Sequence, residues 1–272
     1  MAEQQSPARH GAAIHAPQLV SDELLALTRS LGRPDRDLVI LAEGNTSERL
    51  ADGRIVVKAS GSGMATATND DFVVVDVAEL AQLLTDPAAD QAALTAALDA
   101  GSVDGRRRRG SIEALVHVAV QAVSPTPAAS RFVGHTHPTA VVGLLASVHA
   151  ADSYRRHVYS DEAVVVGRPL FVPYAQPGIE LGRLFHAALR RRVEETGDLP
   201  ALVLLANHGI VAIGPTAAGV DGISAMAVKG ARVRTTAYAV GGIDPLTEEA
   251  VDKFFARDDV AQRRSDLARG AL

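Results

Sequence analysis

The sequence predicts an α/β fold in one large domain. Short apolar segments with the composition of strands alternate with longer segments in which apolar residues recur at helical spacing. The 272 residues, 47% of them hydrophobic, are enough to build one sizeable core. The first residues are largely polar and lack a hydrophobic signal segment, so we expect a flexible tail over residues 1–20 and a single domain over residues 21–272.

Helices are expected where apolar residues repeat every three or four positions between capping residues and helix breakers. Ser21 is placed to cap the first helix, and Gly32 ends it. Ser111 opens a later helix, which ends before Pro125 because proline lacks the amide that a helix interior needs. In chain order, helices are expected over residues 22–31, 77–84, 90–100, 111–123, 138–147, 180–195, 217–239 and 247–255.

Strands are expected where valine, isoleucine and leucine are concentrated between turn residues. The dipeptide Asp52-Gly53 is typical of a hairpin turn. Strands are therefore predicted over residues 54–59, 72–75, 131–136, 163–166, 201–206 and 210–213. Stretches rich in glycine and polar residues predict turns or loops over residues 43–47, 60–63 and 101–110.

Composition excludes several classes of protein. The chain has no cysteine, which excludes disulfides and thiolate metal sites and fits a reducing, cytoplasmic environment. A formal net charge of −5 gives no general attraction to nucleic acid or to an anionic membrane. No apolar run approaches the ~20 residues that span a bilayer. We therefore expect a cytoplasmic protein that binds a small molecule, and neither nucleic acid nor a membrane.

Three histidines are the strongest candidates for a site. His135 and His137 follow an apolar strand, and side chains two residues apart point to the same face of a strand. His208 follows another apolar segment and precedes Gly209. A buried histidine that only bonds a backbone carbonyl is the commoner alternative for any one of them. Together, three imidazoles resemble the ligand set of a catalytic zinc site, which keeps one position open.

Glu113 and Ser111 lie at the expected start of a helix. The simplest interpretation is an ordinary helix cap. The alternative is that Ser111 binds an anion while Glu113 acts as a general acid/base in the same cleft. His117, one turn after Glu113, is expected either to support the site or only to pack in the core, rather than to bind metal. The loops at Asn45 and at Ser60-Gly61 have the same two interpretations, as plain turns or as an anion-binding nest.

Five short motifs occur in the same order as in one family. They are Gly44-Asn45-x-Ser47, Ser60-Gly61, Ser111-x-Glu113, His135-x-His137-Pro138 and Asn207-His208-Gly209. The chain thereby resembles the class II aldolase/adducin family, which includes fuculose- and rhamnulose-phosphate aldolases, a 4-epimerase and some decarboxylases. The resemblance covers roughly residues 20 to 245. It implies a three-layer α/β/α sandwich with a largely antiparallel central sheet, and a homotetramer.

The resemblance also implies residue roles. The metal ligands would be His135, His137 and His208, and the catalytic acid/base would be Glu113. The phosphate-binding residues would be Asn45, Ser60, Gly61 and Ser111. One departure is Gly110, where several sugar-phosphate aldolases have a serine, and none of the four tyrosines can be assigned as an assisting residue.

The expected activity is that of a divalent-metal-dependent lyase. It would cleave a carbon–carbon bond of a small hydroxycarbonyl compound, sugar-like or sugar-phosphate-like, through a metal-stabilised enediolate. Imidazole ligands suit Zn²⁺, with Mn²⁺ or Co²⁺ as substitutes. Decarboxylation and 4-epimerisation use the same chemistry and remain alternatives. A non-catalytic, adducin-like interaction domain is disfavoured because all three histidines are present.

Overall fold

The computed structural model describes residues 12–269, and a mixed eight-stranded sheet forms its centre. The sheet order is β1-β4-β3-β2-β7-β10-β9-β8, and every neighbouring pair is antiparallel except β8 and β9. The strands are β1 (Ala13–Ile14), β2 (Asn45–Arg49), β3 (Ile55–Lys58), β4 (Phe72–Val75), β7 (Phe132–Thr136), β8 (Leu170–Val172), β9 (Leu202–Leu205) and β10 (Gly209–Gly214).

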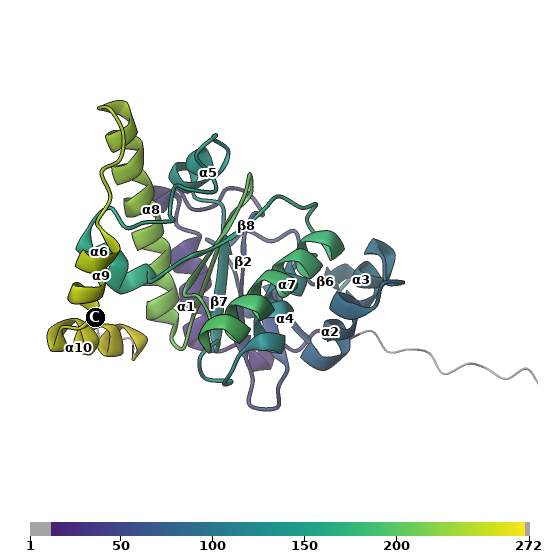
Figure 1. The fold of residues 1–272 in the computed structure, drawn as a ribbon. Coiled ribbons are helices and arrows are strands. Elements are labelled where there is room, and N and C mark those ends of the chain that lie inside the picture. Colours follow the sequence, from purple (N-terminus) through teal and green to yellow (C-terminus); the bar gives the residue numbers. More distant parts are fainter. Residues whose placement is uncertain (1–11, 270–272) are drawn as a thin grey trace, which may run out of the picture.

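Helices cover both faces of this sheet (Figure 1). One face carries α2 (Val77–Thr85), α3 (Gln91–Ala97), α4 (Ala114–Val123) and α7 (Ile179–Thr196). The other face carries α1 (Asp22–Leu31), α5 (Thr139–Leu145), α6 (Ser160–Val166) and α8 (Ala217–Ala239), with α9 (Glu248–Phe255) and α10 (Asp258–Ala268) packed outside α6. The expected three-layer α/β/α class with a largely antiparallel sheet is confirmed.

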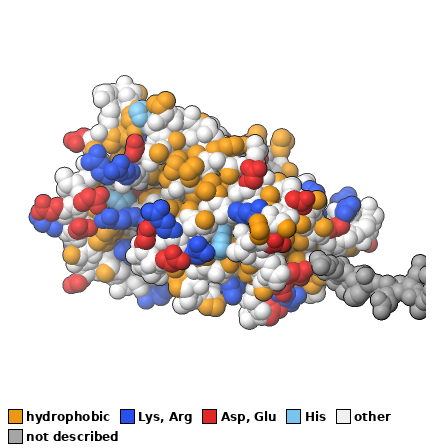
Figure 2. All heavy atoms as spheres, turned by 45° about the vertical axis from the view of Figure 1, so that its right-hand side comes forward, with side chains coloured by type: hydrophobic (Ala, Val, Ile, Leu, Met, Phe, Trp, Pro, Cys, Tyr) orange, Lys and Arg blue, Asp and Glu red, His pale blue; other side chains and the backbone are white. Residues whose placement is uncertain are grey.

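Strand alternation divides the buried side chains into two cores. Val57 and Val73 point toward the layer of α4 and α7, whereas Val56 and Val74 point toward α1 and α8. All four side chains are buried. Because helices cover both faces of the sheet, consecutive residues of β3 and β4 are apolar rather than alternately polar, with Lys58 at the end of β3 as the exception. On the surface drawn in Figure 2, acidic and basic side chains are interspersed among exposed apolar atoms.

Local signals placed several helices correctly. The Ser21 side chain accepts a hydrogen bond from the amide of Leu24, at 3.0 Å, and Gly32 ends α1. The helix predicted from Ser111 begins later, at Ala114. The Ser111 hydroxyl accepts the Glu113 amide, at 3.3 Å, in the turn that leads into α4. None of the helices among the described residues is both long and apolar enough to cross a membrane.

Two predicted segments have a different structure. The valine-rich residues 163–166 were expected to be a strand but form the end of helix α6, where Ala163 and Val166 are buried. Packing against α8 overrides the β-propensity of this short valine run. Residues 43–47 were expected to be a turn, yet Asn45 begins β2 in the middle of the sheet. The polar side chains of β2 are buried because they form hydrogen bonds. One example is the 2.5 Å contact between the hydroxyls of Thr28 and Thr46.

Four further segments were missed or misplaced. The arginine-rich connection over residues 101–110 contains a hairpin of β5 (Asp99–Val103) and β6 (Arg106–Arg109), turned by Asp104-Gly105 with positive φ at both residues. The short edge strand β8 and the C-terminal helix α10 were not predicted. Residues 12–20, expected to belong to a flexible tail, are part of the fold, since Ala13 and Ile14 pair with β4 and Ala16 and Val20 are buried; residues 1–11 lie outside the described residues.

Candidate metal centre

The two central strands β7 and β10 carry the three histidines to one edge of the sheet. His135 lies on β7, and His137 follows one residue after its last residue, Thr136, just before Pro138 at the start of α5. His208 lies in the tight turn between β9 and β10, where Asn207 has a left-handed φ of 52°. A side chain at Gly209 would collide with the Thr136 carbonyl oxygen. Glycine therefore lets the His208 turn lie close against β7.

The metal-binding atoms of these histidines converge with the carboxylate of Glu113. Nε2 of His135 lies 3.0 Å from Nε2 of His137 and 3.2 Å from Oε2 of Glu113. Nε2 of His208 lies 2.8 Å from Oε1 of Glu113. All four donor atoms lie within 4.8 Å of one another. The cluster brings together residues from β7, the β9–β10 turn and the start of α4, which lie up to 95 positions apart in the sequence.

The outer ring nitrogens show how the rings are oriented. Nδ1 of His135 is 2.9 Å from the carbonyl oxygen of Ile210, to which it donates a hydrogen bond. In the neutral ring this tautomer leaves the lone pair on Nε2, facing the cluster. Nδ1 of His137 faces Glu43, whose Oε2 lies 3.6 Å away. Nδ1 of His208 is buried and has no hydrogen-bond partner among residues 12–269.

Charge coupling sets the protonation of the cluster. Burial raises the pKa of Glu113, but the neighbouring His135 and His208 lower it more, so its pKa lies well below the usual range. Burial lowers the pKa of His137 to about 3, assisted by the charge of His135. For His135, burial lowers the pKa, but Glu113 and the Ile210 carbonyl outweigh it and raise the pKa. At neutral pH Glu113 is therefore ionised and His137 is neutral.

These properties fit a divalent cation. Three imidazole nitrogens with lone pairs directed at one point, beside an ionised carboxylate, are the donors that zinc and related ions prefer. The cation would be held by His135, His137 and His208. A proton on any of these ring nitrogens competes with the cation, so cation binding should weaken as the pH falls.

A buried hydrogen-bond chain holds Glu113 in place. The side-chain amide of Asn45 donates to Oε2 of Glu113 at 3.2 Å and to the Ser111 hydroxyl at 3.4 Å. The Asn45 carbonyl oxygen bonds Nε2 of the fully buried His117, whose Nδ1 lies 2.7 Å from the Ser47 hydroxyl. Burial, followed by the charge of His135, lowers the pKa of His117 to about 3 and keeps it neutral. His117 therefore supports Asn45 and contacts none of the three clustered histidines.

The predicted anion-binding residues divide into two groups. Asn45 donates a hydrogen bond to the Glu113 carboxylate, and the Ser111 hydroxyl accepts one from the Glu113 amide. Ser60 and Gly61, by contrast, lie on an exposed turn. The backbone connects that turn to the site, because Ala59 bridges Gly110 and the Ser60 amide donates to the Arg109 carbonyl at 2.9 Å. Among the described contacts, none joins Ser60 or Gly61 to the histidines.

A cavity of about 430 Å³ opens beside the cluster. His137 and His208 line it together with Asp37, Glu43 and Ile40. This volume lies within the range of small-molecule sites. Ile40, which lines the cavity, and its neighbour Leu41 are exposed apolar residues, 63% and 89% accessible.

Two residues near the site were not recognised from the sequence. Glu43 was assigned only to a turn, although a carboxylate beside a Gly-Asn motif was a usable signal. Lys58 was assigned to an apolar strand, where a lysine is itself unusual. Its side chain is fully buried, with Nζ donating to the Ala59 carbonyl at 3.1 Å. Burial lowers the pKa of Lys58 to about 8, although Asp71 and Glu113 raise it.

Glu43 is positioned to orient His137, which leads to a prediction. Glu43→Gln removes the carboxylate beside Nδ1 and should weaken cation binding about tenfold, the lower end of the effect of losing a carboxylate that orients a ligand histidine. Competition with a chelator measures this affinity.

Asp37→Asn is the matched control for this change. Asp37 lines the same cavity, accepts the Thr139 hydroxyl at 2.9 Å and has a left-handed φ that asparagine tolerates. It should retain the cation affinity of the unchanged protein. Equal affinities for both variants would show that Glu43 does not orient His137.

The fold and this centre together define an α/β/α domain with a candidate three-histidine catalytic metal site. Residues 22–220 match the family model described as "Class II Aldolase and Adducin N-terminal domain". The chain therefore belongs to the class II aldolase and adducin family. No curated protein gives a significant sequence match.

Solved structures share the fold at low sequence identity. YgbL from Klebsiella pneumoniae is 21% identical over 88% of this chain and 99% of its own, with a TM-score of 0.64. The N-terminal class II aldolase domain of a conserved protein from Thermoplasma acidophilum is 22% identical over 78% and 92%, with a TM-score of 0.60. L-fuculose-1-phosphate aldolase from Thermus thermophilus is 20% identical over 81% and 98%, with a TM-score of 0.56.

Proposed function

We propose that this protein is a divalent-metal-dependent lyase that cleaves a carbon–carbon bond of a small hydroxycarbonyl compound. The observation that carries the proposal is the cluster of Glu113 with His135, His137 and His208, whose donor atoms lie within 4.8 Å of one another. A non-catalytic domain needs no such arrangement of buried, coupled groups. Family membership supports the same class of chemistry, and a similar fold is found in an L-fuculose-1-phosphate aldolase.

In the proposed reaction the histidines bind the cation, Glu113 transfers the proton and Asn45 orients Glu113. A Zn²⁺ ion, with Mn²⁺ or Co²⁺ as substitutes, would be bound by the three histidines and would stabilise negative charge on a substrate oxygen. Glu113, ionised at neutral pH, accepts the proton of the hydroxyl group whose carbon becomes the aldehyde. The neutral carboxyl of Glu113 then returns a proton to the carbon atom that was bonded to the departing aldehyde carbon. Asn45 keeps Oε2 of Glu113 oriented throughout.

The substrate would lie in the cavity beside His137 and His208. Asn45, Ser60, Gly61 and Ser111 would bind the polar or phosphorylated end of a sugar-like substrate. Decarboxylation and 4-epimerisation are the alternative reactions on this scaffold. We also propose a homotetramer, because the exposed Ile40, beside the cavity, and its neighbour Leu41 present an apolar surface that a second subunit would cover.

A substrate panel tests the proposed function. The purified protein, loaded separately with Zn²⁺, Mn²⁺ and Co²⁺, is incubated with ketoses, ketose 1-phosphates and β-keto acids. We expect aldehyde release from at least one hydroxycarbonyl compound, and we expect chelation to abolish it. Release of CO₂ alone would favour the decarboxylase, and inversion at carbon 4 without net cleavage would favour the epimerase. Turnover that survives complete removal of the cation would contradict the proposal.

A further inference from the structure

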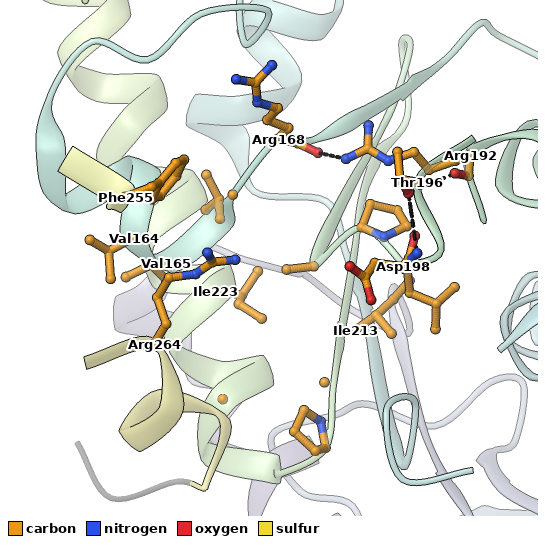
Figure 3. A pocket seen from close by; sticks show the side chains of 18 residues that line it. Val164, Val165, Arg168, Arg192, Thr196, Asp198, Ile213, Ile223, Phe255 and Arg264 are labelled. Atoms are coloured by element: carbon orange, nitrogen blue, oxygen red, sulfur yellow. Dashed lines mark hydrogen bonds between the residues drawn. The ribbon is translucent and has the colours of Figure 1, made fainter. Parts of the chain in front are cut away.

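A second cavity, of about 400 Å³, lies at the end of β10 that is farther from His208. Figure 3 shows the side chains that line it. It is bounded by the ends of α6 and α7, the start of α8 and the two C-terminal helices. His208 precedes β10, whereas Ile213 and Pro215 line the cavity at the far end of that six-residue strand. The strand separates the two sites by roughly 20 Å. The volume of this second cavity is within the usual range of small-molecule sites.

The floor of this cavity is apolar. Val164 from α6, Ile213 from β10 and Ile223 from α8 are buried, and Phe255 from α9 closes one side. These side chains come from four separate elements that meet only in the folded chain. Such a surface suits an aliphatic or aromatic group of a ligand.

Two arginines line the walls above this floor. The Nη2 atom of Arg192 donates to the Arg168 carbonyl at 3.1 Å, but its buried Nε has no hydrogen-bond partner within residues 12–269. Arg264 enters from α10 and lies over the Phe255 ring, 5.1 Å from its centroid. Figure 3 shows its guanidinium directed into the cavity. Within the described part of the chain, Arg264 forms no ion pair.

Arg168 also lines the cavity, but its charge is already neutralised. Its guanidinium lies 2.8 Å from Glu248 and 3.4 Å from Asp252, so it attaches α9 to the end of α6. The charges left facing the cavity are therefore those of Arg192 and Arg264.

A carboxylate faces these arginines from the opposite wall. The side chain of Asp198 projects toward the cavity in Figure 3, while its backbone is fixed by two contacts with the Thr196 hydroxyl, at 3.2 and 3.3 Å. No described residue forms an ion pair with the Asp198 carboxylate at 4.0 Å or less. Opposite charges thus line the two sides of the cavity without pairing with each other, and both Arg264 and Asp198 remain accessible to a ligand.

We propose that this cavity binds a small zwitterion with an apolar side chain, of the class of α-amino acids. The ligand carboxylate contacts the guanidinium groups of Arg192 and Arg264, which suit planar, bidentate recognition. The ligand ammonium contacts Asp198, and the ligand side chain packs on Ile213 and Phe255. The proposal does not depend on the reaction proposed for the histidine site, since it concerns binding alone.

Calorimetric titration of the full chain with L-leucine, L-valine and L-phenylalanine tests the proposal. We expect binding of at least one of them, and at least about tenfold weaker binding of its two single-charge analogues, as for leucine with 4-methylpentanoate and isoamylamine. Equal affinities for the amino acid and its carboxylate analogue would show that the cavity binds anions in general, and would contradict the proposed recognition of a zwitterion. No binding of any of the three amino acids would also overturn it.

Variants locate the binding within the molecule. Arg264→Gln and Asp198→Asn should each weaken amino-acid binding at least about tenfold, because each removes one charged contact. The control is Arg190→Gln, which removes an exposed charge of α7 that pairs with Glu194 at 3.5 Å outside the cavity. Circular dichroism checks that each variant is folded. Unchanged binding by a folded Asp198→Asn or Arg264→Gln protein would contradict the proposed placement.

Discussion

His208→Ala should remove the bound cation and abolish turnover while leaving the fold intact. The imidazole supplies one of the three converging nitrogens, so cation affinity should fall by more than the roughly tenfold to hundredfold expected when a group that only orients a ligand is lost. The fold should survive because His208 lies in a turn and its Nδ1 has no hydrogen-bond partner in the described chain. Elemental analysis measures the cation content, and thermal unfolding measures stability.

The control for this prediction is His186→Ala. His186 lies within α7, away from the cluster, so its loss should leave cation content and turnover unchanged. A His208→Ala protein with full cation content would remove His208 from the ligand set.

Glu113→Gln should retain the cation but lower kcat by about 10² to 10⁴, the usual contribution of a positioned acid/base. Glutamine has the same shape and can still accept the Asn45 amide, but it cannot take up a proton at neutral pH. Steady-state kinetics at saturating cation measure the loss, and elemental analysis confirms that the cation is present.

A comparison with Glu43→Gln separates chemistry from cation binding. Excess cation should restore kcat in Glu43→Gln, because that variant weakens binding alone. It should not restore kcat in Glu113→Gln. Normal turnover by Glu113→Gln would remove this residue from the mechanism.

The convergence of the histidines could be anticipated in part from local rules. His135 and His137 share a face because side chains alternate along a strand, and β7 confirms that a strand ends there. A glycine after His208 permits either an unusual backbone angle or a close approach, and the structure shows a close approach to the Thr136 carbonyl. Such features depend on a few neighbouring residues, so sequence reasoning reaches them.

The polar strand β2 could not be anticipated in the same way. Its residues were assigned to a turn because Gly44, Asn45 and Ser47 favour turns in isolation. In the structure, β3 and β7 flank the strand, and its side chains bond Thr28 and His117 from helices on opposite faces. Those partners lie 18 and 70 positions away, so no local window contains them.

By itself, the sequence determined the fold class, most of the helices and strands, and the residue types available for a metal centre. These follow from periodicity, capping and side-chain chemistry, which act over a few residues. Only the tertiary structure decided that Glu113 meets His135 and His208, that Glu43 faces His137, and that Arg264 and Asp198 face one cavity. These contacts join distant segments, and the order of strands in the sheet and the packing of helices on its faces bring them together.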